Sequence, residues 1–284
     1  DSGKIDIIND EVKDTMIKQT IVSAQNQQEG TGAQQDQDMT SIVSDIIVNT
    51  NTETGSKMIE ELNNSSTNTE NDLSLKVISA ISEKDTTKLN TLSENNKEQI
   101  ETLTETAIKN ADASKESADL IAKVVANASD ELVNKVVEEV SKNSTDENQA
   151  LSAKVMKSIV ETNPDKIETL SDQNKETMIS QTIEAAKNQA EGTSADEIDL
   201  SNTIAEIVTK SDTATAAEVL ETLEDVSNES ESKLSLSVVS NITKQENYEE
   251  KMEILSVTSP IVEQSINKLI EKAVENASSE EDLD

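Results

Sequence analysis

An internal repeat constrains this chain more than any other feature. Residues 73–110 align without gaps on residues 151–188, with 17 identities in 38 positions at a spacing of 78. Residues 14–32 align in the same way on residues 176–194, with 12 identities in 19 positions. Self-similarity of this kind is typical of proteins in which like units stack and share a continuous core. The chain is therefore expected to be a repeat protein.

The alignments divide the 284 residues into tandem units close to the repeat spacing in length. The expected segments are a lead-in over 1–12, helical repeats over 13–96, 97–174 and 175–256, and a partial repeat with an acidic tail over 257–284. The first residues, Asp1-Ser2-Gly3, indicate a processed product or a piece of something longer.

A shorter motif inside the repeats predicts α-helices. Its form is Leu-x-x-Lys-Val-apolar-x-x-apolar, and it starts at Leu73, Leu120, Leu132, Leu151 and Leu234, with Ser237 in place of the lysine in the last copy. Apolar residues at i, i+4, i+5 and i+8 lie along one stripe of a helix. Alternation with a period of two is not sustained anywhere, so no strand is expected.

Capping residues mark the helix boundaries more than breakers do, since the chain has five Gly and two Pro. Pro164 and Pro260 each follow a capping residue and are expected at the first helical position. Other expected boundaries are starts at Asp130, Asp146 and Ser230, each followed by Glu, and ends at Gly30 and Gly192. Helices are expected to start near residues 97, 113, 130, 146, 164, 175, 196, 213, 230, 246 and 259.

Such short helices must pack on one another, because an isolated helix of ~12–15 residues is marginal in water. A single repeat would have a thin core, so we expect an all-α tandem array that forms an elongated, α-solenoid-like stack. The alternative is a string of small helical bundles, one per repeat. The net charge of −34 and 33% hydrophobic residues also warn of disorder, and the frequent helix breaks argue against a long coiled coil.

The missing residue types exclude whole classes of chemistry. The chain has no His, Cys, Trp, Phe or Arg and one Tyr, Tyr248. Zinc fingers, Ser-His-Asp triads, cysteine nucleophiles and iron–sulfur clusters are therefore excluded. The acidic charge opposes nucleic-acid binding, and no apolar run is long enough to span a membrane. The repeats also lack the signature residues of tetratricopeptide, ankyrin and leucine-rich repeats. We expect no enzyme activity, no cofactor, and no catalytic or metal-binding residue.

Two segments resemble pieces of a calcium loop, namely 36–38 (Asp-Gln-Asp) and 49–55. Neither has the ligand spacing of an EF-hand. We interpret them as solvated loops rich in capping residues, and we expect diffuse screening of the acidic surface by divalent cations rather than a specific site.

Other patterns have ordinary structural explanations. Ser265 and Lys268 match the S-x-x-K pair of penicillin-binding folds, but the supporting motifs are missing. The motif lysines 76, 123, 135 and 154 are expected to lay their stems over the core edge, although pairing with acids of a neighbouring helix is open. Seven Asn-x-Ser/Thr sequons, at residues 63, 64, 127, 143, 228, 241 and 276, are close to the number expected by chance. Residues 279–284 are expected to form a frayed, solvated end.

These observations predict a non-enzymatic structural protein, an acidic helical-repeat rod or filament subunit that self-associates head to tail. The charge and the absence of Cys favour an extracellular or cell-surface location, with a cytoplasmic one as the alternative. The alternative function is a solenoid binding module for a basic protein or peptide. The biological partner, the organism and the polymer symmetry do not follow from the sequence.

Overall fold

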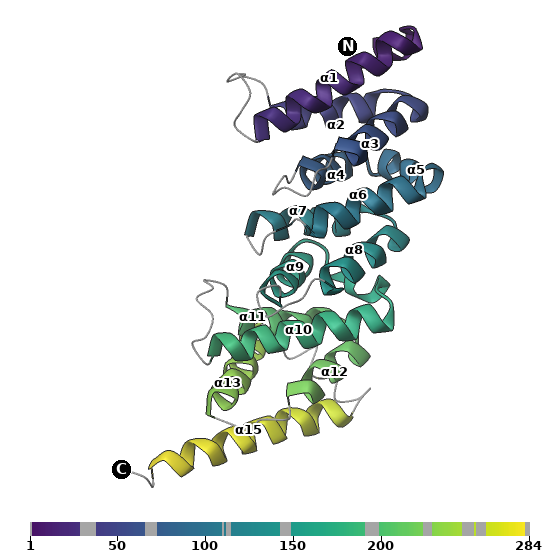
Figure 1. Cartoon of the computed structure of the whole chain (residues 1–284). Coiled ribbons are helices and arrows are strands. Elements are labelled where there is room, and N and C mark those ends of the chain that lie inside the picture. The colour runs from purple at the N-terminus through teal and green to yellow at the C-terminus, as the bar shows by residue number, and fades with distance from the viewer. Residues whose placement is uncertain are drawn as a thin grey trace. The chain divides into compact units, whose positions relative to one another are not determined.

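The computed structural model describes residues 2–28, 38–65, 73–109, 111, 115–142, 149–190, 199–223, 229–245, 253 and 260–281. Within these residues the protein is a helical repeat array, with α- and 3₁₀-helices and no strand (Figure 1). The chain divides into two compact units, Asp1–Asn143 and Ser144–Asp284. The boundary between the two units falls inside the second predicted repeat, so the units do not coincide with the sequence repeats. The repeat boundaries stay a prediction.

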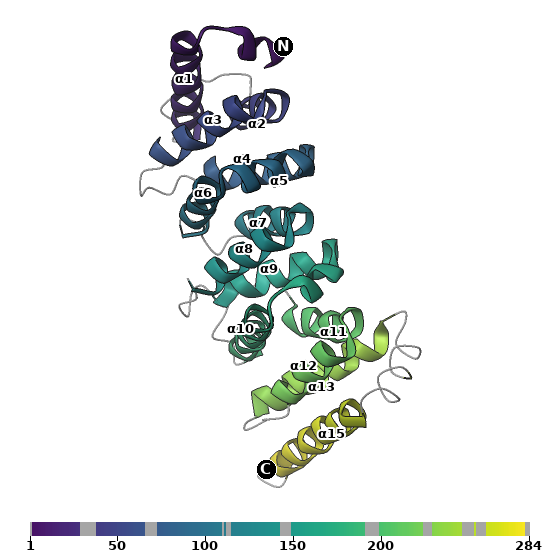
Figure 2. The same ribbon diagram turned by 90° about the vertical axis from the view of Figure 1, so that its right-hand side faces the viewer.

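The first unit contains one 3₁₀-helix and eight α-helices among its described residues. They are η1 (Ser2–Ile7), α1 (Asp10–Gln28), α2 (Met39–Asn49), α3 (Thr52–Ser65), α4 (Leu73–Lys84), α5 (Thr86–Asn95), α6 (Lys97–Lys109), α7 (Lys115–Asn127) and α8 (Asp130–Lys142). Helices α1, α3, α6 and α8 pack in succession, as do α2, α4 and α7 (Figure 2). These two series form two layers, which are joined by the packing of α1 on α2 and of α4 on α6.

Ion pairs show that α4 and α7 run parallel. Lys76 of α4 pairs with Glu116 of α7 at 3.4 Å, and Glu83 of α4 pairs with Lys123 of α7 at 3.1 Å. Going along α4 from Lys76 to Glu83, the partners on α7 go in the same direction, from Glu116 to Lys123, so the two helices are parallel. The favoured prediction for these lysines was coverage of the core edge. The half-buried stems agree with it, but the ammonium groups pair across helices.

The second unit consists, in its described part, of α9 (Gln149–Thr162), η2 (Pro164–Thr169), α10 (Asp172–Ala190), α11 (Leu200–Lys210), α12 (Thr213–Leu223), α13 (Glu229–Lys244) and α15 (Pro260–Glu281). Helix α9 packs on α10 and α11, and α13 packs on α11 and α15. Because α9 comes from the second predicted repeat and α10 from the third, adjacent repeats share an interface. The same is true of α4 with α6 and α7 in the first unit, so the packing is that of a stack and not of one bundle per repeat.

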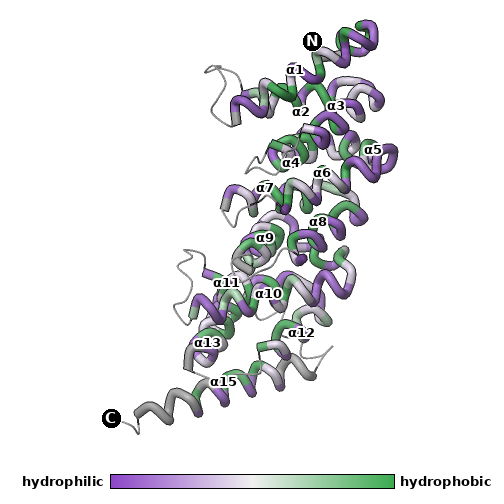
Figure 3. Tube along the Cα trace, in the orientation of Figure 1, coloured by the Kyte–Doolittle hydropathy of each residue, from purple (hydrophilic) through white to green (hydrophobic). Residues whose placement is uncertain are grey.

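The core contains aliphatic side chains contributed by the motif helices. All five apolar positions predicted over 132–140 are buried, and so are the corresponding stripes of α4 and α9. Figure 3 shows the result along the chain, with hydrophobic and hydrophilic residues alternating turn by turn within the helices. Most of the helix stability must come from this shared packing, since each helix is short.

In the described residues, the helix starts agree with the expected ones within four residues, including α10, which begins at Asp172. The start expected near 246 lies outside the described residues. The one correction to the starts is the segment that begins at Pro164, which is a 3₁₀-helix. The Asn163 side chain makes no capping hydrogen bond there, although Pro164 occupies the first helical position as predicted. The structure continues α15 to Glu281, so the predicted frayed end is helical over its first residues. Gly30, Gly192, Asp146 and Tyr248 lie outside the described residues.

Candidate functional site

The repeats carry a polar contact that sequence reasoning missed. A side-chain oxygen on a short helical segment accepts a hydrogen bond from the backbone N–H of the residue just before the third helix after that segment. The three pairs are Asp6 with Asn51 at 2.9 Å, Asn90 with Ser129 at 3.0 Å, and Glu168 with Asp212 at 2.9 Å. The three acceptors lie at corresponding positions of the repeating pattern. They differ in residue type, so an alignment based on identical residues does not reveal them. We interpret this contact as a structural cross-brace.

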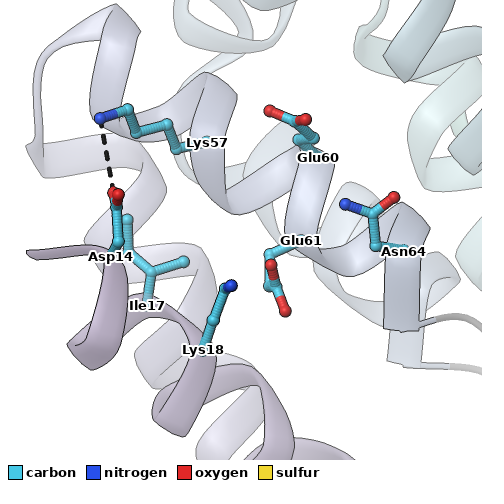
Figure 4. A pocket seen from close by; sticks show the side chains of 7 residues that line it. All are labelled: Asp14, Ile17, Lys18, Lys57, Glu60, Glu61 and Asn64. Atoms are coloured by element: carbon cyan, nitrogen blue, oxygen red, sulfur yellow. Dashed lines mark hydrogen bonds and ion pairs between the residues drawn. The ribbon is translucent and has the colours of Figure 1, made fainter. Parts of the chain in front are cut away.

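A polar cavity of ≈ 270 Å³ opens between α1 and α3 in the first unit (Figure 4). Its lining consists of Asp14, Ile17, Lys18, Lys57, Glu60, Glu61 and Asn64. Helix geometry explains the set, because Asp14, Ile17 and Lys18 are one turn apart on α1, as are Lys57, Glu60/Glu61 and Asn64 on α3. Figure 4 shows the Lys57–Asp14 pair at one side of the cavity and the other polar side chains, Lys18, Glu60, Glu61 and Asn64, around it.

The ion pair between Lys57 and Asp14 dominates the electrostatics of this cavity. Lys57 Nζ lies 3.4 Å from Asp14 Oδ1 and 3.8 Å from Glu53 Oε1. Partial burial of the Lys57 ammonium would lower its pKa, but the hydrogen bond to Asp14 and the attraction of Asp14, Asp10 and Glu53 together raise it above the usual value. Lys57 therefore stays charged, and the cavity offers both donors and acceptors to a polar group.

The corresponding position of the second unit has the opposite electrostatics. By the alignment of residues 14–32 on 176–194, Asp14 corresponds to Glu176 of α10. When the first residue of α3, Thr52, is placed on the first residue of α12, Thr213, Lys57 corresponds to Glu218. The pKa of Glu218 is raised by burial and then by the repulsion of Glu176, Asp172 and Asp212, against an opposing effect of Lys175. An attractive contact between α1 and α3 is thus a repulsive one between α10 and α12.

Neither place brings together the side chains that a metal ion requires. Among the described residues, no three Asp or Glu side chains come together in a way that could hold a metal ion. The cavity residues offer salt bridges and amide hydrogen bonds, which suit recognition of a polar side chain. The candidate calcium segments have other roles: Asp38 caps α2 through Thr40 N at 3.0 Å, and Asn51 caps α3 through Thr54 N at 2.9 Å. The capping interpretation is therefore confirmed for these two residues. The interpretation of 49–55 as a solvated loop is wrong, because residues 52–55 belong to α3 and Thr50, Thr54 and Gly55 are buried. Asp36 and Gln37 lie outside the described part.

The remaining sequence candidates are dispersed along the helices. Ser265 of α15 is buried and Lys268 is exposed, so the structure does not bring this pair together in a pocket. Lys135 pairs with Glu139 of its own helix at 3.0 Å, and Lys154 is half-buried. Asn127 lies at the end of α7, and its Nδ2 donates to Lys123 O at 2.9 Å. Asn63 donates to Gln99 O at 2.7 Å, linking α3 to α6.

A second candidate site is the outward face of α1, where three large apolar side chains are exposed. Val12 is 45% exposed, Met16 39% and Val22 49%. With 3.6 residues per turn, Thr15, Gln19, Thr20, Ser23 and Asn26 complete the same half of the helix. None of these eight residues is charged, although 82 of the 284 residues in the chain are charged. We call this surface the α1 outer face.

The far end of the described chain also exposes apolar residues. Helix α15 buries Ser265 and Leu269 and packs on α13, whereas Ile270 is 38% and Val274 54% exposed. Ile266, one turn before Ile270, is half-buried. These three residues form a stripe at i, i+4 and i+8, which we call the α15 stripe.

A scan of the chain against protein-family models gave no match, and a search of the curated proteins gave none either. No α-helix in the described part of the chain has both the length and the apolarity to cross a membrane. The site therefore has to be interpreted from its own geometry.

Proposed function

We propose that this protein is a non-enzymatic structural protein, an acidic helical-repeat subunit of a rod or filament. The observation that carries the proposal is the packing between adjacent repeats: α4 packs on α6 and α7, and α9 packs on α10 and α11. A helix face of this kind that stays exposed, as at Val12, Met16 and Val22 of α1, can pack on a second copy of the chain. Contact through them between copies is heterologous and can continue without closing.

The charge of the chain fits this use. Surplus carboxylates keep separate subunits apart in dilute solution at low salt, and salt screens that repulsion. Self-association is therefore expected to increase with ionic strength. Diffuse divalent cations would act in the same direction. An extracellular or cell-surface location, where such ions are abundant, suits the proposal best.

A binding module for a basic protein or peptide is the second candidate, and the α1–α3 cavity favours it. Glu60, Glu61 and Asn64 offer acceptors to a lysine ammonium beside the paired Lys57. Such binding would depend on charge attraction, so it would weaken as ionic strength rises. The two functions thus predict salt effects of opposite sign.

The test is sedimentation velocity and negative-stain electron microscopy of the purified full chain over a wide concentration range. Measurements in low salt and in about 1 M salt separate the two functions. The rod or filament function predicts a mass that grows with concentration and more steeply in high salt. A mass of 30.8 kDa at every concentration in both solutions would contradict it. Capture of an oligolysine peptide that salt abolishes would favour the binding module.

A further inference from the structure

The α1 outer face corresponds to a surface that is covered elsewhere in the same chain. The repeat alignments place Met16 with Ile100 of α6 and with Met178 of α10. Ile100 is 1% exposed and Met178 is fully buried, against 39% for Met16. The same position is therefore a packing position in two copies of the helix and an open one in the first copy.

The neighbouring positions behave in the same way. Thr20 and Ser23 of α1 are half-buried, whereas their counterparts Thr104 and Ala107 in α6 are buried, and so are Thr182 and Ala185 in α10. In the first unit the cover comes from α4, because Leu75 and Ile78 line the same small cavity as Thr104 and Ala107. In the second unit α9 packs on α10. Helices α4 and α9 align with each other in the repeat.

We infer that the α1 outer face is a docking surface for a second copy of this chain, which binds through its α15 stripe. This inference rests on the proposed self-association and names the two surfaces that would perform it. The part of the face formed by Met16, Thr20 and Ser23 resembles the internal repeat interface, where the equivalent residues of α6 and α10 are buried. A charged partner has little to bind there, because all eight residues of the face are uncharged.

The α15 stripe is the matching surface that the described chain offers. Ile266, Ile270 and Val274 project one turn apart from a helix whose other side is already buried on α13. Since the α1 outer face and the α15 stripe differ, a contact between them is heterologous, and each added copy presents a new free face. The same geometry explains how a single kind of subunit would extend into a rod.

The experiment uses three variants of the full chain in about 1 M salt, where repulsion is screened. Met16→Glu places a charge in the α1 outer face, and Ile270→Glu places one in the α15 stripe. Ser180→Glu adds the same charge to an exposed position of α10 and is the matched control. Far-ultraviolet circular dichroism verifies that each variant keeps its helix content. Mass is measured by sedimentation velocity over a concentration series.

We expect Met16→Glu and Ile270→Glu each to associate at least about a hundredfold more weakly than the unmodified chain, because an apolar contact that buries an unpaired carboxylate is strongly disfavoured. Ser180→Glu should associate as the unmodified chain does. An equal mixture of Met16→Glu and Ile270→Glu should form a dimer that grows no further, because one intact α15 stripe then meets one intact α1 outer face.

Three results would overturn the inference. Undiminished association of both variants would refute the named surfaces while leaving the proposed rod or filament in place. Dimerisation of Ile270→Glu alone would mean that two α1 outer faces pair with each other. A monomeric unmodified chain under all conditions would refute the inference and the proposed function together.

Discussion

Gly55 offers a sharp test of the repeat correspondence, because the second unit already contains the substitution. Gly55 lies inside α3, fully surrounded, and its counterpart in α12 is the buried Ala216. A Cβ on Gly55 would lie 3.4 Å from Leu92 Cδ2, 3.5 Å from Ile47 O and 3.6 Å from Lys88 Cε. These are ordinary van der Waals distances, so a methyl group fits without displacing the backbone.

The expected size of the effect follows from two contributions. Glycine inside a helix costs roughly 0.5–1 kcal/mol relative to alanine, and a buried methyl group contributes up to about 0.8 kcal/mol. Allowing for a small shift of Leu92, Gly55→Ala should raise the free energy of unfolding by about 1 kcal/mol. The reciprocal change Ala216→Gly should lower it by about 1–2 kcal/mol, since it removes both contributions and leaves a small void.

Thermal unfolding followed by circular dichroism measures the change, with an expected rise of about 3 °C for Gly55→Ala. Amide hydrogen exchange in α3 and α12 assigns the change to the correct unit. Gly55→Val is the control for volume: its added methyl groups would press on Leu92 and Lys88 and should destabilise the protein by about 1–3 kcal/mol. A lowered or unchanged midpoint for Gly55→Ala would refute the equivalence of α3 and α12.

The remaining predictions concern charge. Glu218→Lys would give Glu176 an ion-pair partner, as Lys57 is for Asp14 in the first unit. The free energy of unfolding in urea at neutral pH should rise by about 0.3–1 kcal/mol, and a fall would contradict the assigned repulsion. Because the pKa of Glu218 is raised in the folded protein, its destabilising effect is absent below the ordinary carboxyl pKa and fully present above the raised pKa. The gain in stability from Glu218→Lys should therefore shrink as the pH falls. Unfolding curves at several pH values would show this. Burial opposes ionisation of Glu139, but hydrogen bonds from Lys142 and Lys135 lower its pKa. Its stabilising effect is therefore full above the ordinary carboxyl pKa and is lost as the pH falls through the lowered pKa. Glu139→Gln should make the free energy of unfolding depend less on pH in the acid range, and an unchanged pH dependence would count against this role. Asp38→Ala removes the cap of α2 and should cost about 1 kcal/mol in the same urea assay; an unchanged stability would contradict the capping role.

Local chemistry made the helices predictable. The stripe over 132–140 is buried as its period requires, and the starts near 97, 130 and 213 agree with the structure, because periodicity and dipole-compatible first turns act within a few residues. The start expected near 164 is a 3₁₀-helix, since the Asn163–Pro164 pair sets the first turn but does not determine whether later turns continue as an α-helix.

The candidate sites were far less predictable. Asp38 and Asn51 were recognised as polar loop residues, and their capping role follows from local rules. The cross-brace between Glu168 and Asp212 joins residues that are distant along the chain, and its residue types vary between repeats. The cavity between α1 and α3 depends on which helix faces are adjacent, and the period of one helix says nothing about which neighbour it faces.

The amino-acid sequence alone determined that this protein is built from repeated short helices, because an apolar stripe with a period of 3.6 residues can be buried only by a helix that packs on others. It also determined the exclusion of histidine and cysteine chemistry, since those side chains are missing. Only the tertiary structure decided that helices pack in two layers, that Lys76 and Lys123 bridge α4 and α7, and that Met16 is exposed where Ile100 and Met178 are buried. The physical reason is that burial depends on what lies beside a residue: residues 14–32 and 176–194 share 12 of 19 aligned residues, yet Met16 is exposed and Met178 is buried.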